Sequence, residues 1–268
     1  MTPEPAALGE DSRSHIAKWL AREPEMETAL LFAASGRPLA ALWGAVLDAW
    51  LEACFMPSDA GVARVKLAWW GEALGQTSAE SAHPLVRAFA LAGGEAVPAT
   101  LWADAAHSAL ELVSREAHPT DFPALIGSRM ALGRALAAVE SALWPDSGAG
   151  DAGAVARSLV VWQWRQHRRE RDPRPGWLPL QLLARHSLRA QDVYANPADP
   201  AVAPLLADMA EALLGCPCAP VGPRLRRART RLDTLALRRL RRGHPQPFAG
   251  SGLGILWQSW CASRGVAG

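Results

Sequence analysis

Several residue types are scarce in this sequence, and each shortage excludes a class of protein. Isoleucine occurs only three times and alternating β-branched runs are nearly absent, so a protein built on β-sheets is not expected. The cysteines at 54 and 261 are isolated, and those at 216 and 218 lie too close together for a four-ligand zinc site. No signal peptide or uninterrupted membrane span is recognisable, which favours a cytoplasmic protein with reduced thiols.

Lysine is scarce as well, because Lys18 and Lys66 are the only lysines among 28 basic residues. Together with abundant alanine, this bias is typical of a GC-rich bacterial genome and says nothing about function. The 26 acidic residues bring the formal charge to +2, which argues against a protein that coats polyanions. Half of the 268 residues are hydrophobic, so a folded chain with a large core is expected rather than disorder.

Apolar residues recur at spacings of three and four along most of the chain, separated by proline and glycine, and this periodicity predicts an all-α protein. We expect one domain over 15–248 between tails at 1–14 and 249–268. Asp59 and Asp121 are placed to cap two of the helices. The predicted helices span 12–23, 25–36, 38–55, 59–75, 82–93, 97–116, 121–144, 151–171, 201–214, 223–242 and 252–263.

The predicted helix 59–75 carries two adjacent apolar stripes, one containing Val62 and Trp69 and the other containing Trp70. Lys66 lies between them, on the side that this pattern predicts to be buried. A buried ammonium is costly unless its stem extends to a crevice edge, it forms an ion pair, or it meets an anionic ligand. Lys66 is therefore a candidate ligand contact or a lysine whose stem extends to solvent.

The predicted helix 151–171 has an apolar face that reaches Trp162 and continues as Gln166 and Glu170, which are four residues apart. Arg165 lies beside this face. An apolar wall that becomes polar at one end is typical of a pocket mouth. The alternative is an ordinary helix whose last turn is solvated and whose cations complement the helix dipole.

Asp48 and Glu52 are the only charges between Arg37 and Asp59 and are also four residues apart, on the predicted helix 38–55. Two carboxylates at this spacing could share a divalent ion. The alternative is that they form the solvated stripe of an otherwise apolar helix.

The segment 224–242 contains nine arginines and one aspartate and is a basic amphipathic helix. Such a helix can lie on an anionic membrane or contact an acidic partner, or it can pack through its leucines and leave its arginines solvated. Nucleic acid is not expected as a partner, since there is no aromatic stacking platform and no helix-turn-helix pattern. Peripheral contact at the inner face of the membrane is the alternative to a purely cytoplasmic location.

Four short segments together resemble the squalene/phytoene synthase-like family. VKLAWWGEAL at 65–74 and HPLVRAFA at 83–90 are similar to that family's "R/K-L-x-W-W-x-x-x-L … H-P" signature. GWLPLQLLARHSL at 176–188 resembles the "Y-L-P-x-x-L-L-x-x-x-G-L" that follows its second acidic motif, and RLRRGHPQPF at 239–248 resembles its "R-R-G-x-D-P-F" ending. The matches keep the family's order over roughly 15–248.

The resemblance implies an isoprenoid-synthase fold, with helices around a central cavity. Catalytic members condense two prenyl diphosphates, and two aspartate-rich motifs on facing helices hold the Mg²⁺ that binds the diphosphates. An apolar, aromatic-walled cavity shelters the carbocation from water. A prenyl diphosphate or another lipid-like molecule is thus the expected ligand.

The acidic motifs depart from the family's pattern. Its "R-D-x-x-x-D" falls on Arg165, Gln166 and Glu170, so the first aspartate is an amide here. The "D-D-x-x-D" motif has only Asp48 and Glu52 as a remnant. The lost charge disfavours Mg²⁺.

The resemblance therefore implies an impaired or non-catalytic isoprenoid-binding or accessory protein, as in relatives that include a mitochondrial complex I assembly factor. One alternative is an active Mg²⁺-dependent prenyltransferase, and another is a structural all-α interaction or assembly protein whose interior is filled by tryptophan. The expected substrate-binding residues are Lys66, Trp70, Arg165 and Gln166. The expected ligands of any metal are Asp48, Glu52 and Glu170.

Overall fold

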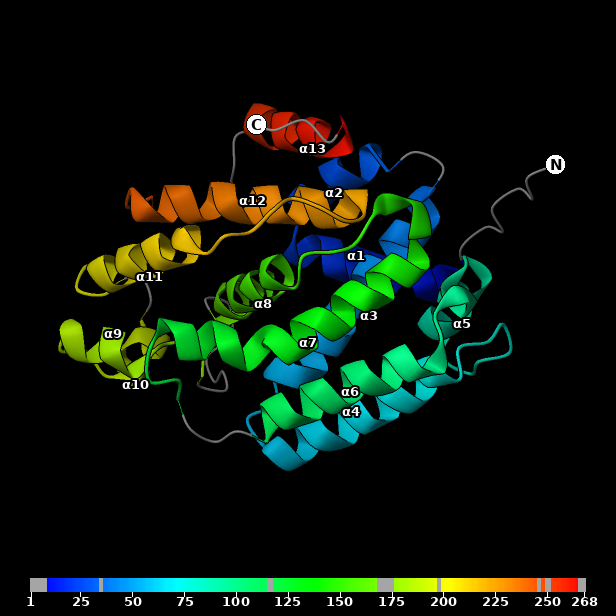
Figure 1. Ribbon diagram of the computed structural model, residues 1–268, viewed down its shortest axis with the longest axis horizontal. Coiled ribbons are helices and arrows are strands. Elements are labelled where there is room, and N and C mark those ends of the chain that lie inside the picture. The colour runs from blue at the N-terminus through cyan, green and yellow to red at the C-terminus, as the bar shows by residue number, and fades with distance from the viewer. Residues whose placement is uncertain are drawn as a thin grey trace.

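A computed structural model describes residues 9–33, 36–114, 118–167, 176–196, 199–244, 247–248 and 252–264. Within these ranges all regular secondary structure is helical, as predicted (Figure 1). The helices are α1 Glu10–Arg22, α2 Glu25–Leu31, α3 Arg37–Phe55, α4 Ala60–Gly75, α5 Pro84–Leu91, α6 Ala99–Val113, α7 Phe122–Leu143, α8 Ala152–His167, α9 Leu180–Arg185, α10 Ala190–Ala195, α11 Ala203–Gly215, α12 Arg224–Arg241 and α13 Gly252–Arg264. Two 3₁₀ turns, η2 Gly94–Ala96 and η3 Pro145–Ser147, complete the described elements.

Two predicted helix caps are confirmed. The Asp59 carboxylate accepts the backbone N–H of Gly61 at 2.5 Å and that of Val62 at 3.2 Å, at the start of α4. The Asp121 carboxylate accepts the N–H of Ala124 at 2.8 Å, at the start of α7. Each aspartate satisfies donors that the first turn of a helix leaves without a partner.

Helix α8 lies in the middle of the molecule, between α7 on one side and α3 and α12 on the others (Figure 1). Every residue from 154 to 166 is buried. Helices α7 and α8 approach so closely that a Cβ atom at Gly133 would lie 2.6 Å from the carbonyl oxygen of Ala152, so only glycine fits there. Helices α4 and α6 form one edge of the molecule, and α12 and α13 form the opposite edge.

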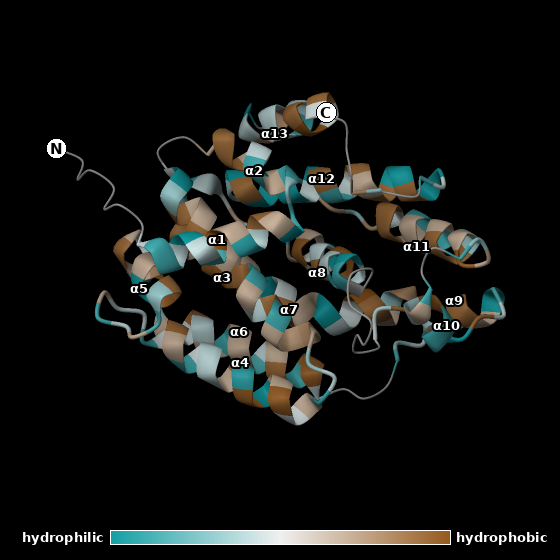
Figure 2. Ribbon diagram, turned by 180° about the vertical axis from the view of Figure 1, so that it is seen from behind, coloured by the Kyte–Doolittle hydropathy of each residue, from teal (hydrophilic) through white to brown (hydrophobic). Residues whose placement is uncertain are grey.

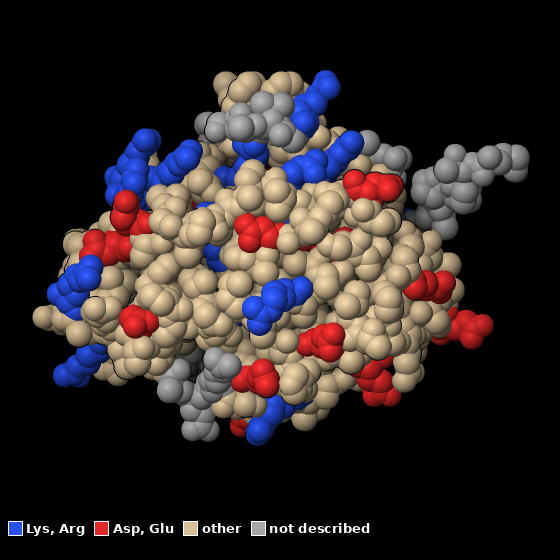
Figure 3. Space-filling model, in the orientation of Figure 1, with Lys and Arg blue, Asp and Glu red and all other residues tan. Residues whose placement is uncertain are grey.

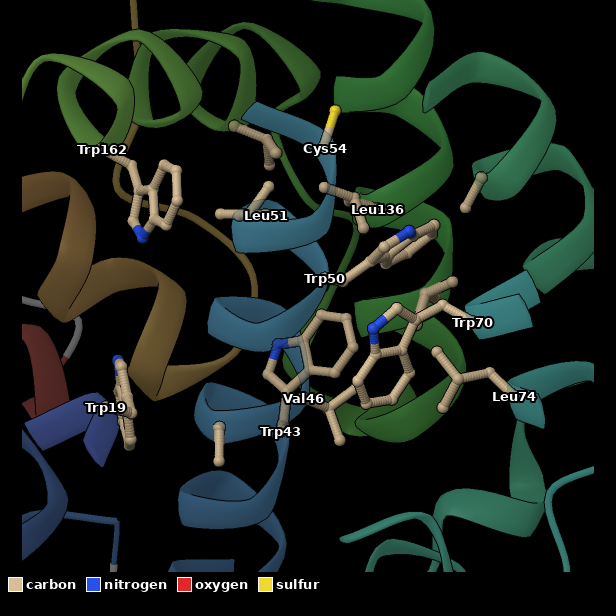
Figure 4. Packing of buried hydrophobic residues seen from close by; sticks show 14 of the residues in the cluster. Trp19, Trp43, Val46, Trp50, Leu51, Cys54, Trp70, Leu74, Leu136 and Trp162 are labelled. Carbon is tan, nitrogen blue, oxygen red and sulfur yellow. The ribbon is translucent and has the colours of Figure 1, made fainter. Parts of the chain in front are cut away.

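Tryptophan side chains fill much of the core around α3. Figure 4 shows Trp19 and Trp162 on one side of α3 and Trp50 and Trp70 on the other. The ring centroids of Trp50 and Trp102 are 6.0 Å apart, a distance at which aromatic side chains attract each other. A second cluster of buried apolar side chains surrounds the far side of α8 and the helices α9 to α11.

By length and composition, α3 and α7 are the two described helices that could cross a membrane. Helix α3 is mostly buried among other helices, as a core helix is. Core helices share this length and composition, so these features alone do not indicate a membrane span.

Candidate functional site

Asp48 and Glu52 lie side by side on α3, as their spacing predicted. A single guanidinium bridges them: Nη1 of Arg22, from α1, lies 3.0 Å from Oδ2 of Asp48 and 2.7 Å from Oε2 of Glu52. The ammonium of Lys18 lies 3.0 Å from the same Glu52 oxygen. Two cations of the chain itself therefore neutralise this acidic pair.

Asp48 faces α8, because the indole of Trp162 donates a hydrogen bond of 3.2 Å to its Oδ1. Burial and the nearby charge of Glu23 raise the pKa of Asp48 to about 6, although Arg22 opposes this shift. Glu52 is half-exposed, and burial would raise its pKa as well. Hydrogen bonds from Arg22 and Lys18 outweigh burial there and lower the pKa of Glu52 below its usual value.

Whether Asp48 and Glu52 could bind Mg²⁺ depends on whether their carboxylate oxygens are free. Each of the four carboxylate oxygens of Asp48 and Glu52 already accepts a hydrogen bond from Trp162, Arg22 or Lys18. The described residues contain no group of three acidic, histidine or cysteine side chains placed to hold a metal. Mg²⁺ requires free oxygen ligands, so the residues described here do not fit it. The third expected ligand, Glu170, lies outside the described residues.

Arg165 and Gln166, on α8, are both buried. The last turn of the predicted helix 151–171, from 168 on, lies outside the described residues, so the alternative of a solvated last turn stays open. The Arg165 guanidinium forms a salt bridge with Glu25 of α2, and its carbon lies 4.1 Å from the ring centroid of Phe248. Arg165 thus already has an anionic partner. The amide nitrogen of Gln166 is buried and has no hydrogen-bond partner among the described residues.

The placement predicted for Lys66 is wrong. Lys66 is exposed, and so are Val62 and Trp69 on the same side of α4. Only the stripe that contains Trp70 is buried, because α4 lies at the edge of the molecule and packs on α3 and α6. Lys66 and Trp70 therefore do not meet Arg165 and Gln166 in one pocket among the described residues.

Two of the segments that carry the family resemblance contact each other, and the other two both contact α8. Rings of Trp69 and Trp70, from 65–74, lie 5.2 and 5.4 Å from that of His83, at the start of 83–90. On α8, Trp164 contacts both Trp177, at 6.3 Å, and Phe248, at 5.1 Å. The segments 176–188 and 239–248 therefore both pack on α8.

Buried ion pairs extend from this region toward α12, and nothing in the sequence pattern predicted them. Glu23 pairs with Arg229, and Trp19 donates a hydrogen bond of 2.6 Å to Glu23. Although burial opposes it, the charges of Arg229 and then Arg165 lower the pKa of Glu23 to about 2. Asp233 accepts a hydrogen bond from the hydroxyl group of Ser158 on α8.

A second pair joins α7 to α12. The guanidinium of Arg226 donates hydrogen bonds of 2.6 and 2.9 Å to the two oxygens of Glu140, and Trp43 donates another of 3.1 Å. Two arginines of 224–242 thus point into the molecule. The amphipathic helix itself is confirmed as α12, but its apolar side is buried rather than available to a membrane.

The space enclosed by Trp19, Asp48, Trp162 and Arg229 measures about 20 Å³, which is room for about one water molecule. A much larger opening, of about 800 Å³, lies at the surface beside the start of α12.

No protein family model, no curated protein and no solved structure matches the chain. The residues around Asp48 are therefore interpreted from their contacts alone: the carboxylates are neutralised and lie in a packed interior.

Proposed function

We propose that the chain is a non-catalytic accessory protein built on a squalene/phytoene synthase-like scaffold. One observation carries this proposal: the guanidinium of Arg22 lies between Asp48 and Glu52, where a working enzyme of that class would need a divalent cation. The arginine pairs with both carboxylates in the place of a metal ion. A leaving diphosphate would then find neither a metal nor free acidic ligands.

The buried polar groups support the same conclusion. Arg165 is held by Glu25, and Arg229 is held by Glu23, so these cations are already neutralised. The space beside Asp48 holds about one water molecule, which is too little for a prenyl chain. A protein whose interior is occupied in this way acts through its surface, by binding a partner or a lipid assembly.

Support for the scaffold comes from the motif segments. Segments 65–74 and 83–90 contact each other through Trp69, Trp70 and His83, and 176–188 and 239–248 both pack on α8. Asp48 faces the same helix. This is the relation that two acidic motifs on facing helices would have.

The proposal is tested by pyrophosphate release from farnesyl and geranylgeranyl diphosphate, with and without Mg²⁺. The expected result is no release above background. Calorimetric titration with Mg²⁺ should also show no binding by the wild type. Release that requires Mg²⁺ and is lost in Glu52→Gln would overturn the proposal.

A gain-of-binding variant makes the test sharper. Arg22→Gln frees Oδ2 of Asp48 and one hydrogen-bond position on Oε2 of Glu52, and it should produce Mg²⁺ binding that the wild type lacks. Arg64→Gln, an exposed arginine on α4, is the matched control and should leave Mg²⁺ binding unchanged. Equal Mg²⁺ binding by all three proteins would contradict the role assigned to Arg22.

A further inference from the structure

Helix α13 exposes its apolar face rather than burying it. Leu253, Leu256, Trp257 and Trp260 follow the spacing of one helix face, and all four are exposed, Leu253 to 80% and Trp257 to 57%. The opposite face, with Cys261 and Ala262, is buried against α12 and α2. Figure 1 shows α13 as the outermost helix at this edge of the molecule.

The exposed side chains form one continuous surface. The rings of Trp257 and Trp260 are stacked, with centroids 5.1 Å apart, and the guanidinium of Arg264 lies 5.9 Å from the Trp260 centroid. A contiguous apolar patch of this kind costs free energy in water and marks a surface that is covered in function. We call these residues, Leu253, Leu256, Trp257 and Trp260, the α13 face.

Arginines lie around both ends of the α13 face. Arg239 lines a small crevice together with Ile255, near the start of α13. At its other end Arg224, Arg227 and Arg264 line the opening of about 800 Å³, so three cations face the single acidic residue of its lining, Asp146. In Figure 3 basic side chains gather at the edge formed by α12 and α13. Helix α13 itself contains no acidic residue.

The opening beside α13 is suited to an anionic group. Arg227 donates to the carbonyl oxygens of Ala262 and Gly222, at 2.7 and 2.6 Å, which fixes its guanidinium at the opening. Burial, together with the charges of Arg224 and Arg231, lowers its pKa. A phosphate in the opening would relieve this repulsion between arginines.

We propose that the α13 face, with the arginines around it, docks onto the surface of an anionic phospholipid bilayer. The tryptophans would lie at the level of the headgroups, where their amphipathic rings are favoured, and the leucines would reach the acyl chains. Arg224, Arg227 and Arg264 would bind lipid phosphates. Membrane contact through 224–242 was one alternative for that segment, and here it falls to the next helix instead, since the apolar side of α12 is buried.

Charge complementarity favours a membrane over a protein partner. Tryptophans and leucines on the outer face of a surface helix, with arginines near its ends, match both the acyl region and the anionic headgroup region of such a bilayer. The proposal does not depend on the proposed function, because it concerns another surface. A protein that turned over prenyl diphosphates could still dock in this way.

Helix α4 offers a matched control within the same chain. Val62, Val65 and Trp69 are also exposed, and Arg64 and Lys66 accompany them. Figure 2 shows apolar residues on α4 and on α13, at opposite edges of the molecule. One flat bilayer cannot contact both patches at once, so variants at Trp69 separate general stickiness from docking through α13.

The test is co-sedimentation of the full chain with phosphatidylcholine vesicles and with vesicles that also contain phosphatidylglycerol. Binding is expected only with phosphatidylglycerol and should weaken as salt is added. Trp257→Ala with Trp260→Ala should lower the binding constant at least tenfold. Trp69→Ala should leave it unchanged. Unfolding curves of all variants check that the fold is retained, which is expected because the side chains are exposed.

Two further variants separate the components of the surface. Trp257→Phe with Trp260→Phe should restore binding but remove the fluorescence quenching caused by lipids brominated in their acyl chains. Arg224→Gln with Arg227→Gln should reduce the salt dependence. Equal binding to both kinds of vesicle would overturn the proposal, and so would a loss of binding in Trp69→Ala. The proposal would also be overturned if the protein bound no vesicles and the α13 variants changed only self-association or the capture of a protein partner.

Discussion

The ion pair between Glu140 and Arg226 is expected to be the most sensitive polar contact of the fold. Both side chains are almost fully buried, and the guanidinium makes two short hydrogen bonds to the carboxylate. Glu140→Ala would leave a buried positive charge and an unpaired Trp43 N–H. The loss of one partner of such a pair costs about 3–5 kcal/mol. That is a large share of a total stability of about 5–15 kcal/mol.

The magnitude can be measured by urea unfolding, followed by far-UV circular dichroism, of Glu140→Leu, Arg226→Leu and the double variant. The double variant should be more stable than the sum of the two single losses predicts, because it leaves no charge unpaired. The expected difference is about 2 kcal/mol. The exposed pair between Arg241 of α12 and Glu211 of α11 is the control. Its removal should cost less than about 1 kcal/mol. A loss below about 1 kcal/mol in Glu140→Leu would refute the reasoning.

Three further predictions concern other parts of the fold. Gly44→Ala places a Cβ atom 2.2 Å from the Trp19 ring and should cost about 1–3 kcal/mol in thermal unfolding; an unchanged Tm would contradict this. Asp59→Ala removes the cap of α4 and should cost about 1 kcal/mol by the same assay, and a loss-free variant would argue against the cap. The pKa of Asp48 is raised from 3.8 to about 6 in the folded protein, so the carboxyl group loses its proton at lower pH in the unfolded chain. The contribution of Asp48 to stability therefore falls as the pH rises from about 4 to about 6. Asp48→Asn should abolish this fall of about 1–3 kcal/mol, measured by urea unfolding across that range, and identical pH profiles would disprove it.

The adjacency of Asp48 and Glu52 could be predicted, because it depends only on the period of one helix. Their neutralisation could not, since Arg22 lies 26 residues before Asp48 and on another helix. Periodicity tells which residues share a face, and it does not tell which faces meet. The same reason explains why the pairs of Arg226 and Arg229 were missed.

The error at Lys66 has a different origin. Apolar residues on two stripes of α4 suggested that both were buried, but a helix at the edge of a bundle has neighbours on one side only. Val65 remains exposed on the outer side. Apolar composition is a poor guide to burial in such helices, because much of any protein surface is apolar. Helices α9 and α10 were missed because six residues are too few to establish a period.

The burial of α8 has a consequence for how the protein is made. Backbone amides between 154 and 166 are expected to be the slowest to exchange their hydrogens with solvent, because every residue of this stretch is buried. Helix α8 is covered partly by α3, where Asp48 contacts Trp162, a residue 114 positions later in the chain. It is also covered by α12, where Asp233 contacts Ser158, a residue 75 positions earlier. A nascent chain on the ribosome therefore leaves one side of its most protected helix open until α12 has been synthesised.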